Sequence, residues 1–354
     1  MTARKRLRAA LIGTGGIADV HLTAFQACKT DIELVAAVDI DEDRARAFAQ
    51  KAGVEPYTEV SRMLAEQRPD LVAICTPPSL HVGQTVEVLE SGAWAWCEKP
   101  PCLSLAGYDA ITAAETEGGP YASFVFQHRF GSGAEHFREL LAKGELGRPL
   151  VAHCQTTWYR DTGYYAVPWR GKWETEGGGP AMGHGIHQMD LLLDLLGEWT
   201  EVSAMTARLV HDVETEDVST ALVRFANGAL ATVVNSVLSP QEVSRIRVDC
   251  TEATVELTHL YGYRNADWVY SKDFPQPEVD VPSSHTAQLP HVIEAIRAGK
   301  RPPASGSDGR KALELIAALY KSASTGAIVR AGEITARDPF HHSMNGRIRE
   351  GVPS

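Results

Sequence analysis

Residues 13–18 form a glycine-rich segment whose spacing, G-x-G-x-x-A, suits the binding of a pyrophosphate. In such a segment the first glycine permits a tight turn, and the second lets backbone N–H groups approach the phosphates. The small third residue lets the next helix pack on the preceding strand, and the N-terminus of that helix attracts negative charge. We therefore predict a dinucleotide site, against the alternative of a glycine-rich turn without a ligand. The expected contacts are Gly13, Gly15, Gly16 and Ile17.

Asp39 ends the next apolar run, about twenty residues further on, where a carboxylate can accept hydrogen bonds from ribose hydroxyls. The same carboxylate repels a 2′-phosphate, and the residue after it is Ile40 rather than an arginine. The sequence thus favours NAD as the cofactor, with NADP the less favoured alternative.

The elements that must position these residues are indicated by apolar runs that alternate with amphipathic stretches. Strands separated by helices predict a parallel, doubly wound Rossmann sheet. Further along, two alternating runs flank Asn227-Gly228, a two-residue hairpin signal that predicts an α+β domain with a largely antiparallel, open-faced sheet. We expect a dinucleotide-binding domain over 1–126, a substrate-binding and oligomerisation domain over 127–335, and a polar tail over 336–354.

Composition narrows the class of partner. The formal net charge of the 354 residues is −11, which disfavours nucleic acid and anionic membranes as partners. No apolar run reaches the ~18 residues that a membrane helix needs. The six cysteines form no C-x-x-C pair, and several lie in apolar runs. This pattern fits a reduced, cytoplasmic protein that needs no disulfide.

Three further segments carry a family resemblance. They read C-T-P-P-S-L-H at 75–81, C-E-K-P at 97–100, and, within 177–190, three consecutive glycines followed by a final G-I-H-Q-M-D. With the N-terminal glycines, they make the chain similar to the glucose–fructose oxidoreductase/inositol dehydrogenase (Gfo/Idh/MocA) family. The resemblance implies assembly through the open sheet face of the second domain, as a homodimer or homotetramer.

The resemblance also implies roles for individual residues. It places Lys99 beside the nicotinamide and the substrate hydroxyl, and Glu98 on the nicotinamide-side ribose. The residues it implies along the dinucleotide channel and at its nicotinamide end are Thr76, Pro77, His81 and Gln127. The position of Glu98 and Lys99 after an apolar run agrees, because open parallel sheets bind ligands beyond the carboxyl ends of their strands. The competing interpretation is a surface lysine paired with Glu98.

His184, His187 and Asp190 are spaced three apart, so they fall on neighbouring turns of one side of a helix. Their types leave three interpretations open: a metal site, imidazoles that cap a buried helix start, or a general base. The family match places its active-site histidine at His187. Many members carry an aspartate four residues earlier, where this chain has Gly183. Either His184 reaches into the space left by the aspartate, or the pocket is enlarged for a substrate such as a glycoside.

Aromatic and hydrogen-bonding residues of the expected substrate-binding domain suit the binding of sugar rings. The expected substrate contacts here are Tyr159, Trp169, Arg170 and Tyr263, each of which could instead fill a core. We therefore expect hydride transfer between NAD(P) and a secondary alcohol or ketone of a sugar, sugar derivative or cyclic polyol. One alternative is an enzyme that retains NAD for transient oxidation during elimination, epimerisation or glycoside cleavage. The other is a non-catalytic NAD-binding sensor.

Overall fold

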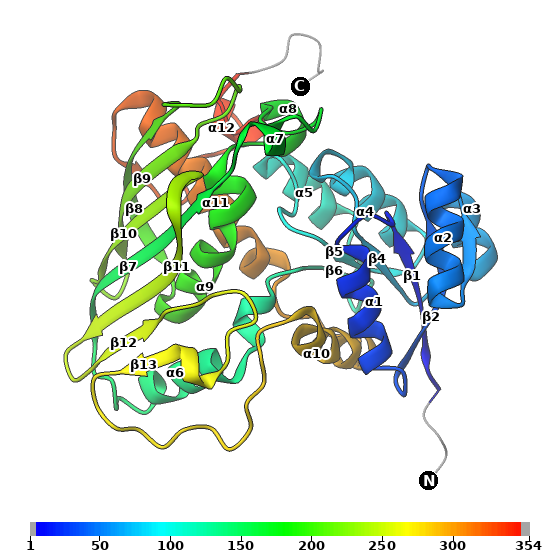
Figure 1. Cartoon of the computed structure of the whole chain (residues 1–354), viewed down its shortest axis with the longest axis horizontal. Coiled ribbons are helices and arrows are strands. Elements are labelled where there is room, and N and C mark those ends of the chain that lie inside the picture. Colours follow the sequence, from blue (N-terminus) through cyan, green and yellow to red (C-terminus); the bar gives the residue numbers. More distant parts are fainter. Residues whose placement is uncertain (1–4, 348–354) are drawn as a thin grey trace. The chain divides into compact units, whose positions relative to one another are not determined.

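The chain folds into two compact units, which Figure 1 traces along the sequence. This computed structural model describes residues 5–347. The first unit comprises the chain up to residue 102 together with 107–125 and 285–310, and the second comprises 103–106, 126–284 and 311 onward. The first unit therefore receives a segment from the last third of the chain, which the expected boundary near residue 126 assigns to the second domain.

A six-stranded parallel sheet forms the centre of the first unit. Its strands are β1 (Leu7–Ile12), β2 (Ile32–Val38), β3 (Glu55–Tyr57), β4 (Leu71–Ile74), β5 (Trp94–Cys97) and β6 (Ala122–Phe124). The order β3-β2-β1-β4-β5-β6 is that of a doubly wound dinucleotide-binding sheet, which confirms the expected Rossmann fold. All four residues of β4 and of β5 are buried, as expected for strands that helices cover on both faces.

Helices connect these strands, and α2 has a capping residue at each end. They are α1 (Ala18–Ala27), α2 (Glu42–Ala52), α3 (Val60–Gln67), η1 (Pro78–Leu80), α4 (His81–Glu90) and α5 (Leu105–Ala113). The carboxylate of Asp41 accepts hydrogen bonds from the first backbone N–H groups of α2, and the left-handed Gly53 ends that helix. These signals fix where the chain leaves and re-enters the sheet.

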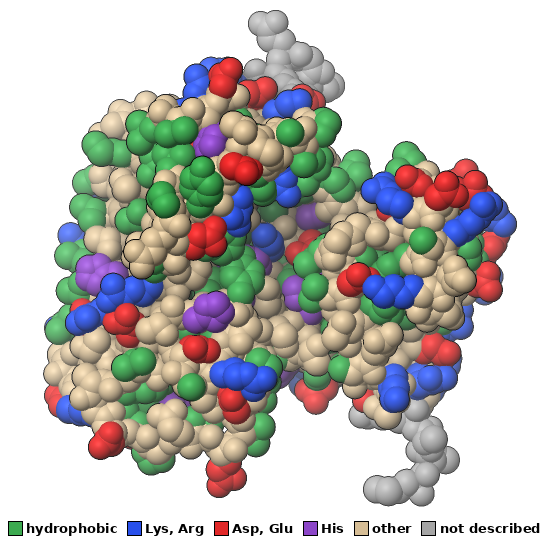
Figure 2. Space-filling model, in the orientation of Figure 1, with side chains coloured by type: hydrophobic (Ala, Val, Ile, Leu, Met, Phe, Trp, Pro, Cys, Tyr) green, Lys and Arg blue, Asp and Glu red, His purple; other side chains and the backbone are tan. Residues whose placement is uncertain are grey.

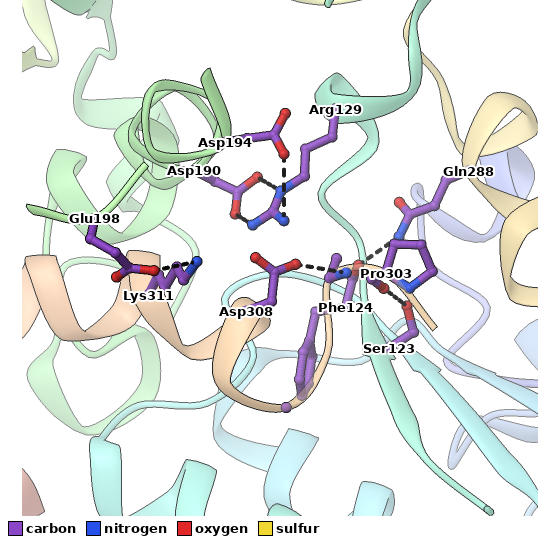
Figure 3. Close-up of polar contacts among 12 residues, drawn as sticks. Ser123, Phe124, Arg129, Asp190, Asp194, Glu198, Gln288, Pro303, Asp308 and Lys311 are labelled. Atoms are coloured by element: carbon purple, nitrogen blue, oxygen red, sulfur yellow. Dashed lines mark hydrogen bonds and ion pairs between the residues drawn. The ribbon is translucent and has the colours of Figure 1, made fainter. Parts of the chain in front are cut away.

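Helix α10 (His285–Ala298) belongs to the first unit because its apolar face completes that unit's core. Leu289, Val292 and Ile293 are at most 3% exposed and join the core cluster of this unit. Burial of each such side chain stabilises the fold by about 1.5–3 kcal/mol. Polar contacts reinforce the join: Gln288 Nε2 donates to the Phe124 carbonyl at 2.7 Å, as Figure 3 shows.

An eight-stranded sheet forms the second unit, in the order β13-β12-β11-β7-β10-β9-β8-β14. Its strands are β7 (Pro149–Tyr159), β8 (Trp199–Ala207), β9 (Val218–Phe225), β10 (Leu230–Ser236), β11 (Leu238–Cys250), β12 (Thr254–Leu257), β13 (Trp268–Tyr270) and β14 (Val329–Arg330). Only the β7–β10 pair is parallel among them. Strands β9 and β10 pair antiparallel across Asn227-Gly228, with Gly228 at φ +90°, so the expected hairpin is confirmed.

Helices cover one face of this sheet, and side chains alternate between buried and exposed along its strands. The helices are η2 (Gln127–Phe130), α6 (Ser132–Ala142), α7 (Thr162–Tyr165), α8 (Trp173–Glu176), η3 (Ala181–Gly185), α9 (Ile186–Leu196), η4 (Asn265–Asp267), α11 (Gly306–Thr325) and α12 (Pro339–His342). The other face leaves Leu222 64% and Leu230 48% exposed. The expected polar tail includes α12, whose Phe340 is buried, and its residues 348–354 lie outside the described part of the chain.

The surface carries charges of both signs. Figure 2 shows acidic and basic side chains interspersed over the face in view. Among residues 5–347, no helix is both long enough and apolar enough to cross a bilayer.

Candidate active site

The glycine turn lies between β1 and α1. At Gly13 it packs against the backbone of Cys75, and at Gly15 and Gly16 it borders open space. Gly13 has φ +90°, and a Cβ there would stand 2.9 Å from the carbonyl carbon of Cys75, so only glycine fits. A Cβ on Gly15 or Gly16 would meet no atom within 4 Å. Ile17 occupies the position before the first turn of α1. The turn is therefore a cradle of backbone N–H groups at a helix N-terminus, a shape and charge that fit a pyrophosphate.

Asp39 follows β2 and is 7% exposed. Its Oδ2 accepts hydrogen bonds from the backbone N–H and the hydroxyl of Thr14, both at 2.9 Å. Its Oδ1 accepts from the Asp41 N–H at 3.0 Å. Burial by itself would raise the pKa of Asp39, but these hydrogen bonds and the nearby Arg44 hold the pKa below its ordinary value. The carboxylate is thus ionised and fixed against the glycine turn.

Two exposed side chains flank this carboxylate. Ile40 has 91% of its surface exposed, which leaves a free apolar face beside the expected ribose position. Arg44 places Nη2 3.0 Å from Asp39 Oδ1, and its side chain is 57% exposed. Arginine is the residue type that accommodates a 2′-phosphate. Our sequence interpretation considered only Ile40, the residue next to Asp39, and missed Arg44. Arg44 lies in the first turn of α2, which brings its side chain back to Asp39.

The loops after β4 and β5 are tied together by a buried histidine. His81 is 0% exposed, with Nδ1 2.8 Å from the Pro100 carbonyl oxygen and Nε2 2.9 Å from that of Thr76. Burial lowers the pKa of His81. Pro77 precedes the short helix η1, and the Thr76 hydroxyl bonds Gln84. Since the His81 ring does not reach the surface, any effect on a dinucleotide is exerted through these two loops.

Glu98 and Lys99 follow β5 at the carboxyl edge of the sheet. Glu98 is 6% exposed, and its Oε1 lies 2.9 Å from Nε2 of His21 and 2.8 Å from Nε2 of His285. Both imidazoles lie on the same carboxylate oxygen, and the place on the ribose that the resemblance implies for Glu98 stays a prediction. Lys99 is half-buried. No local pattern predicts this arrangement, because the two histidines stand 77 and 187 residues from Glu98 in the chain.

His187 lies in the second unit, in the first turn of α9, directly after the single π-helical turn η3. It is 2% exposed, and its ring packs edge-on against His128 at 5.0 Å and Tyr261 at 5.6 Å between centroids. π-Helical turns are rare and often occur at functional sites. Gln127, in η2, is also buried.

A set of aromatic rings, called here the aromatic wall, extends from His187. It consists of Tyr261, Trp158, His184 and Tyr164. Trp158 packs 5.3 Å from Tyr261 and 5.0 Å from His184, and the Tyr164 hydroxyl lies 3.4 Å from His184 Nε2. These rings offer flat apolar faces with polar edges.

Two arginines stack on the far end of the aromatic wall. The Arg170 guanidinium lies 3.8 Å from the centre of the Tyr164 ring and 4.4 Å from that of Trp169. Arg160 lies 4.9 Å from the centre of the Trp158 ring. The expected substrate contacts Trp169 and Arg170 therefore adjoin the wall, while Arg160 was not predicted.

Two expected substrate contacts lie elsewhere. Tyr263 is 0% exposed and donates its hydroxyl to the His128 carbonyl at 2.6 Å, so it packs in the core, while Tyr261 packs against His187. Tyr159 is 51% exposed. Successive side chains of a strand point to opposite faces. Trp158 therefore belongs to the aromatic wall, and its neighbour Tyr159 points away from it.

Gly183 leaves open space where the family often has an aspartate. A Cβ built there would meet no atom within 4 Å. His184 packs on Trp158 and Tyr164 and therefore does not fill this space. The open space one turn before His187 agrees with the hypothesis of an enlarged pocket.

Asp190 does not form a site with the two histidines. It is 1% exposed, and both its oxygens accept hydrogen bonds from Arg129, with Arg129 Nε 2.7 Å from Oδ2. Figure 3 shows this pair and the second carboxylate, Asp194, beside the same guanidinium. A bidentate pair of this kind fixes η2 against α9. Asp190 thus holds the helix of His187 in place.

Glu216 anchors the segment that leads into η3. Its carboxylate, 5% exposed, accepts hydrogen bonds from the backbone N–H groups of Gly179 at 2.9 Å and Ala181 at 3.2 Å, and from the Tyr320 hydroxyl at 2.8 Å. Burial raises the pKa of Glu216 to about 7. Our sequence interpretation did not include Glu216, which lies 29 residues beyond His187 in a polar stretch.

The two parts of the chain match two family descriptions. Residues 7–124 match the oxidoreductase family with an NAD-binding Rossmann fold, and residues 134–256 match the GFO/IDH/MocA C-terminal domain. The chain belongs to the GFO/IDH/MocA oxidoreductase family. As a member, it is an NAD-dependent oxidoreductase, which confirms the cofactor expected from the glycines and Asp39.

Relatives of this family member span almost its whole length. D-glucoside 3-dehydrogenase of Escherichia coli is 28% identical over 91% of this chain and 97% of its own. Myo-inositol 2-dehydrogenase of Thermotoga maritima is 28% identical over 93% of this chain and 99% of its own. The WlbA dehydrogenase of Bordetella pertussis, solved with NADH and UDP-GlcNAcA, superposes with a TM-score of 0.83 at 28% identity and covers 92% of this chain and 99% of its own.

Proposed function

We propose that this oxidoreductase transfers hydride reversibly between NAD and a secondary alcohol, or the matching ketone, of a sugar, a sugar derivative or a cyclic polyol. The observation that carries the proposal is the placement of His187 at the end of the aromatic wall, on a chain that also bears an NAD cradle. The names of the glucoside and inositol dehydrogenase relatives support the substrate class.

The cofactor would be held by residues of the first unit. The backbone of the glycine turn faces the pyrophosphate, Asp39 accepts from the adenosine ribose, and Ile40 offers an apolar surface to the adenine. When bound, NAD supplies a nicotinamide carbon that accepts or returns hydride. The fixed, ionised state of Asp39 supports this assignment.

The proton would be handled by Lys99 and His187. Oxidation of an alcohol releases the hydroxyl proton as hydride leaves the same carbon, so a base at that hydroxyl accelerates the step. His187 is held by Asp190 and Arg129 through α9, and its ring is packed on Tyr261, so its orientation is fixed. The aromatic wall would stack on the sugar ring, and the open space beside Gly183 would admit a second ring or an aglycone.

The decisive experiment is a screen of the purified protein, with NAD and separately with NADP, against a panel of sugars, glycosides and polyols. Formation of reduced cofactor with members of this panel is the expected result. Turnover of a glycoside without net NADH would favour the alternative enzyme that retains NAD. Cofactor binding without any turnover across the panel, in both directions, would favour the sensor and contradict the proposal.

We also propose that the chain assembles into a homodimer or homotetramer through the open face of the eight-stranded sheet. A shallow hollow of about 380 Å³ on this face is lined by exposed apolar side chains, among them Val151, Leu222, Leu230 and Ile328. Apolar patches of this kind mark protein interfaces. Light scattering should give a mass above that of one chain, and Leu222→Glu should reduce it. A monomeric wild-type protein would contradict this.

We also propose a cytoplasmic location, on the evidence of the cysteines. All six cysteines are free thiols, and four of them are buried. Reduced cysteines are typical of proteins that stay in the cytosol. Fractionation of the source cells should recover the protein with cytoplasmic markers, and recovery with secreted proteins would contradict it.

A further inference from the structure

Three buried polar side chains meet within the first unit, and we refer to them as the Glu98 cluster: His21, Glu98 and His285. His21 comes from α1, Glu98 follows β5, and His285 begins α10; they are 0%, 6% and 5% exposed. The two imidazole rings lie edge-on at 4.8 Å, and the Trp96 ring packs against both. The cluster is thus enclosed by apolar and aromatic surface.

The hydrogen bonds of the cluster keep Glu98 ionised. Burial alone would raise the pKa of Glu98, but hydrogen bonds from His21 and His285 to Oε1 hold it well below its ordinary value. Burial also lowers the pKa of His21. Glu98 is therefore the group that gives the cluster its negative charge.

The distances are those of hydrogen bonds and not of shared metal ligands. The two nitrogens stand 2.9 and 2.8 Å from the carboxylate oxygen. Ligands of a tetrahedral zinc, each bonded at ~2.0–2.2 Å, stand about 3.3 Å apart. The negative charge is accordingly shared with two N–H donors; because the same three side chains are also of the types that hold a metal ion, the test below includes the zinc content.

The strand order indicates which half of a bound dinucleotide would lie nearest this charge. The pyrophosphate cradle follows β1, and Asp39, the ribose acceptor, follows β2. The sheet continues on the other side of β1 with β4 and β5. A dinucleotide that crosses the sheet edge at this switch point has its adenosine half toward β2, so its nicotinamide half extends toward β4 and β5. Glu98 is the first residue after β5.

Three of the ionisable side chains around Glu98 are uncharged and do not cancel its charge. The thiols of Cys75 and Cys97 lie close enough to interact with Glu98, but burial raises their pKa values well above the ordinary thiol value, so they stay neutral. His81, whose pKa burial lowers, is a neutral ring near pH 8.5. Lys99, the next residue in the chain, is half-buried.

We propose that the Glu98 cluster is a fixed, buried negative charge that favours the positively charged oxidised nicotinamide over the neutral reduced one. The charge of Glu98 acts in a low-dielectric setting, where Coulomb interactions are stronger than in water. The cluster then makes the protein hold NAD⁺ more tightly relative to NADH and biases the bound equilibrium toward NAD⁺ and the alcohol, the direction of ketone reduction. The inference depends on NAD binding and not on which alcohol reacts.

The test compares the dissociation constants of NAD⁺ and NADH, measured by titration at pH 8.5 without substrate. Glu98→Gln keeps an oxygen for the two histidine donors but removes the charge. We expect it to weaken NAD⁺ binding relative to NADH about tenfold, equal to about 1.4 kcal/mol. Glu98→Asp, which keeps the charge, should leave the ratio within about threefold of wild type. Asp39→Asn, at the adenosine end, should weaken both forms alike.

A ratio unchanged in Glu98→Gln would overturn the proposal. If that variant does not fold, as judged by circular dichroism, the wild-type protein decides: NADH bound tenfold or more tightly than NAD⁺ would be incompatible with it. Elemental analysis adds an independent check, because one equivalent of zinc per purified chain would put a metal ion on the Glu98 carboxylate, which contradicts the proposal.

Discussion

Replacing Glu216 by glutamine should remove a loss of unfolding free energy that the wild-type protein undergoes as the pH rises. Glu216 is 5% exposed and accepts three hydrogen bonds, two of them from the backbone that leads into η3. Its pKa rises from 4.5 to about 7 because burial disfavours the carboxylate more than these donors favour it. Burial also raises the pKa of Tyr320, so that phenol remains a neutral donor.

The raised pKa of Glu216 decides whether stability rises or falls with pH. Below pH about 4.5 Glu216 is protonated in both the folded and the unfolded chain, and its contribution to stability is complete. As the pH rises through about 7, the unfolded chain is already ionised and the folded protein must ionise a buried acid, so stability is lost. The difference between the two pKa values corresponds to about 3 kcal/mol. Glu216→Gln does not titrate and escapes this loss.

The assay is denaturant unfolding of wild type and Glu216→Gln at several pH values from 5 to 9. The amide nitrogen of glutamine faces the Gly179 N–H, so the variant should lose about 1 kcal/mol at every pH. Relative to wild type it should gain most of the 3 kcal/mol between pH 5 and 9. Glu117→Gln, on an exposed side chain, is the matched control and should show no such trend. A stability difference for Glu216→Gln that is constant over this range would refute the reasoning, since Glu216 would then be ionised throughout.

Three further perturbations address the cofactor, the proton and the pocket. Asp39→Ala should weaken NAD binding and narrow its advantage over NADP, because the ribose acceptor is lost and Arg44 is released; a wild-type preference for NADP in parallel titrations would contradict this. Lys99→Ala should lower turnover ~10²-fold or more with little change in NAD affinity; unchanged steady-state turnover would make the lysine structural. Gly183→Asp should fail to improve turnover of the true substrate, since its carboxylate would enter the open space, and a clear gain would argue against an enlarged pocket.

Local patterns predicted the parts of the fold that short segments decide. Gly13 is required by its φ and by the Cys75 backbone, and this requirement appears directly as a glycine in sequence. Asp39 was predictable because a strand end fixes where a carboxylate must stand. The β9–β10 hairpin was predictable because its turn needs Asn227-Gly228.

Features that depend on distant contacts were not predictable. Nothing local distinguishes Tyr263, which is buried, from Tyr261, which packs on His187, because residues 258–264 have no regular periodicity. Helix α10 has an ordinary apolar face, and the sequence does not state which sheet that face covers. His21 and His285 likewise show no sign of meeting at Glu98 until the chain is folded.

The return of α10 to the first unit has a consequence for how the chain is made. During synthesis the six strands leave the ribosome early, but Leu289, Val292 and Ile293, which complete their core, emerge only after strands β7–β13 of the second sheet. Until then, apolar surface around Phe25 and Trp96 stays without its covering helix, a state in which nascent chains are prone to associate. Nascent N-terminal chains should therefore depend on chaperones for longer than their length suggests. A nonsense codon near residue 280 should destroy the Rossmann unit although every one of its strands is present.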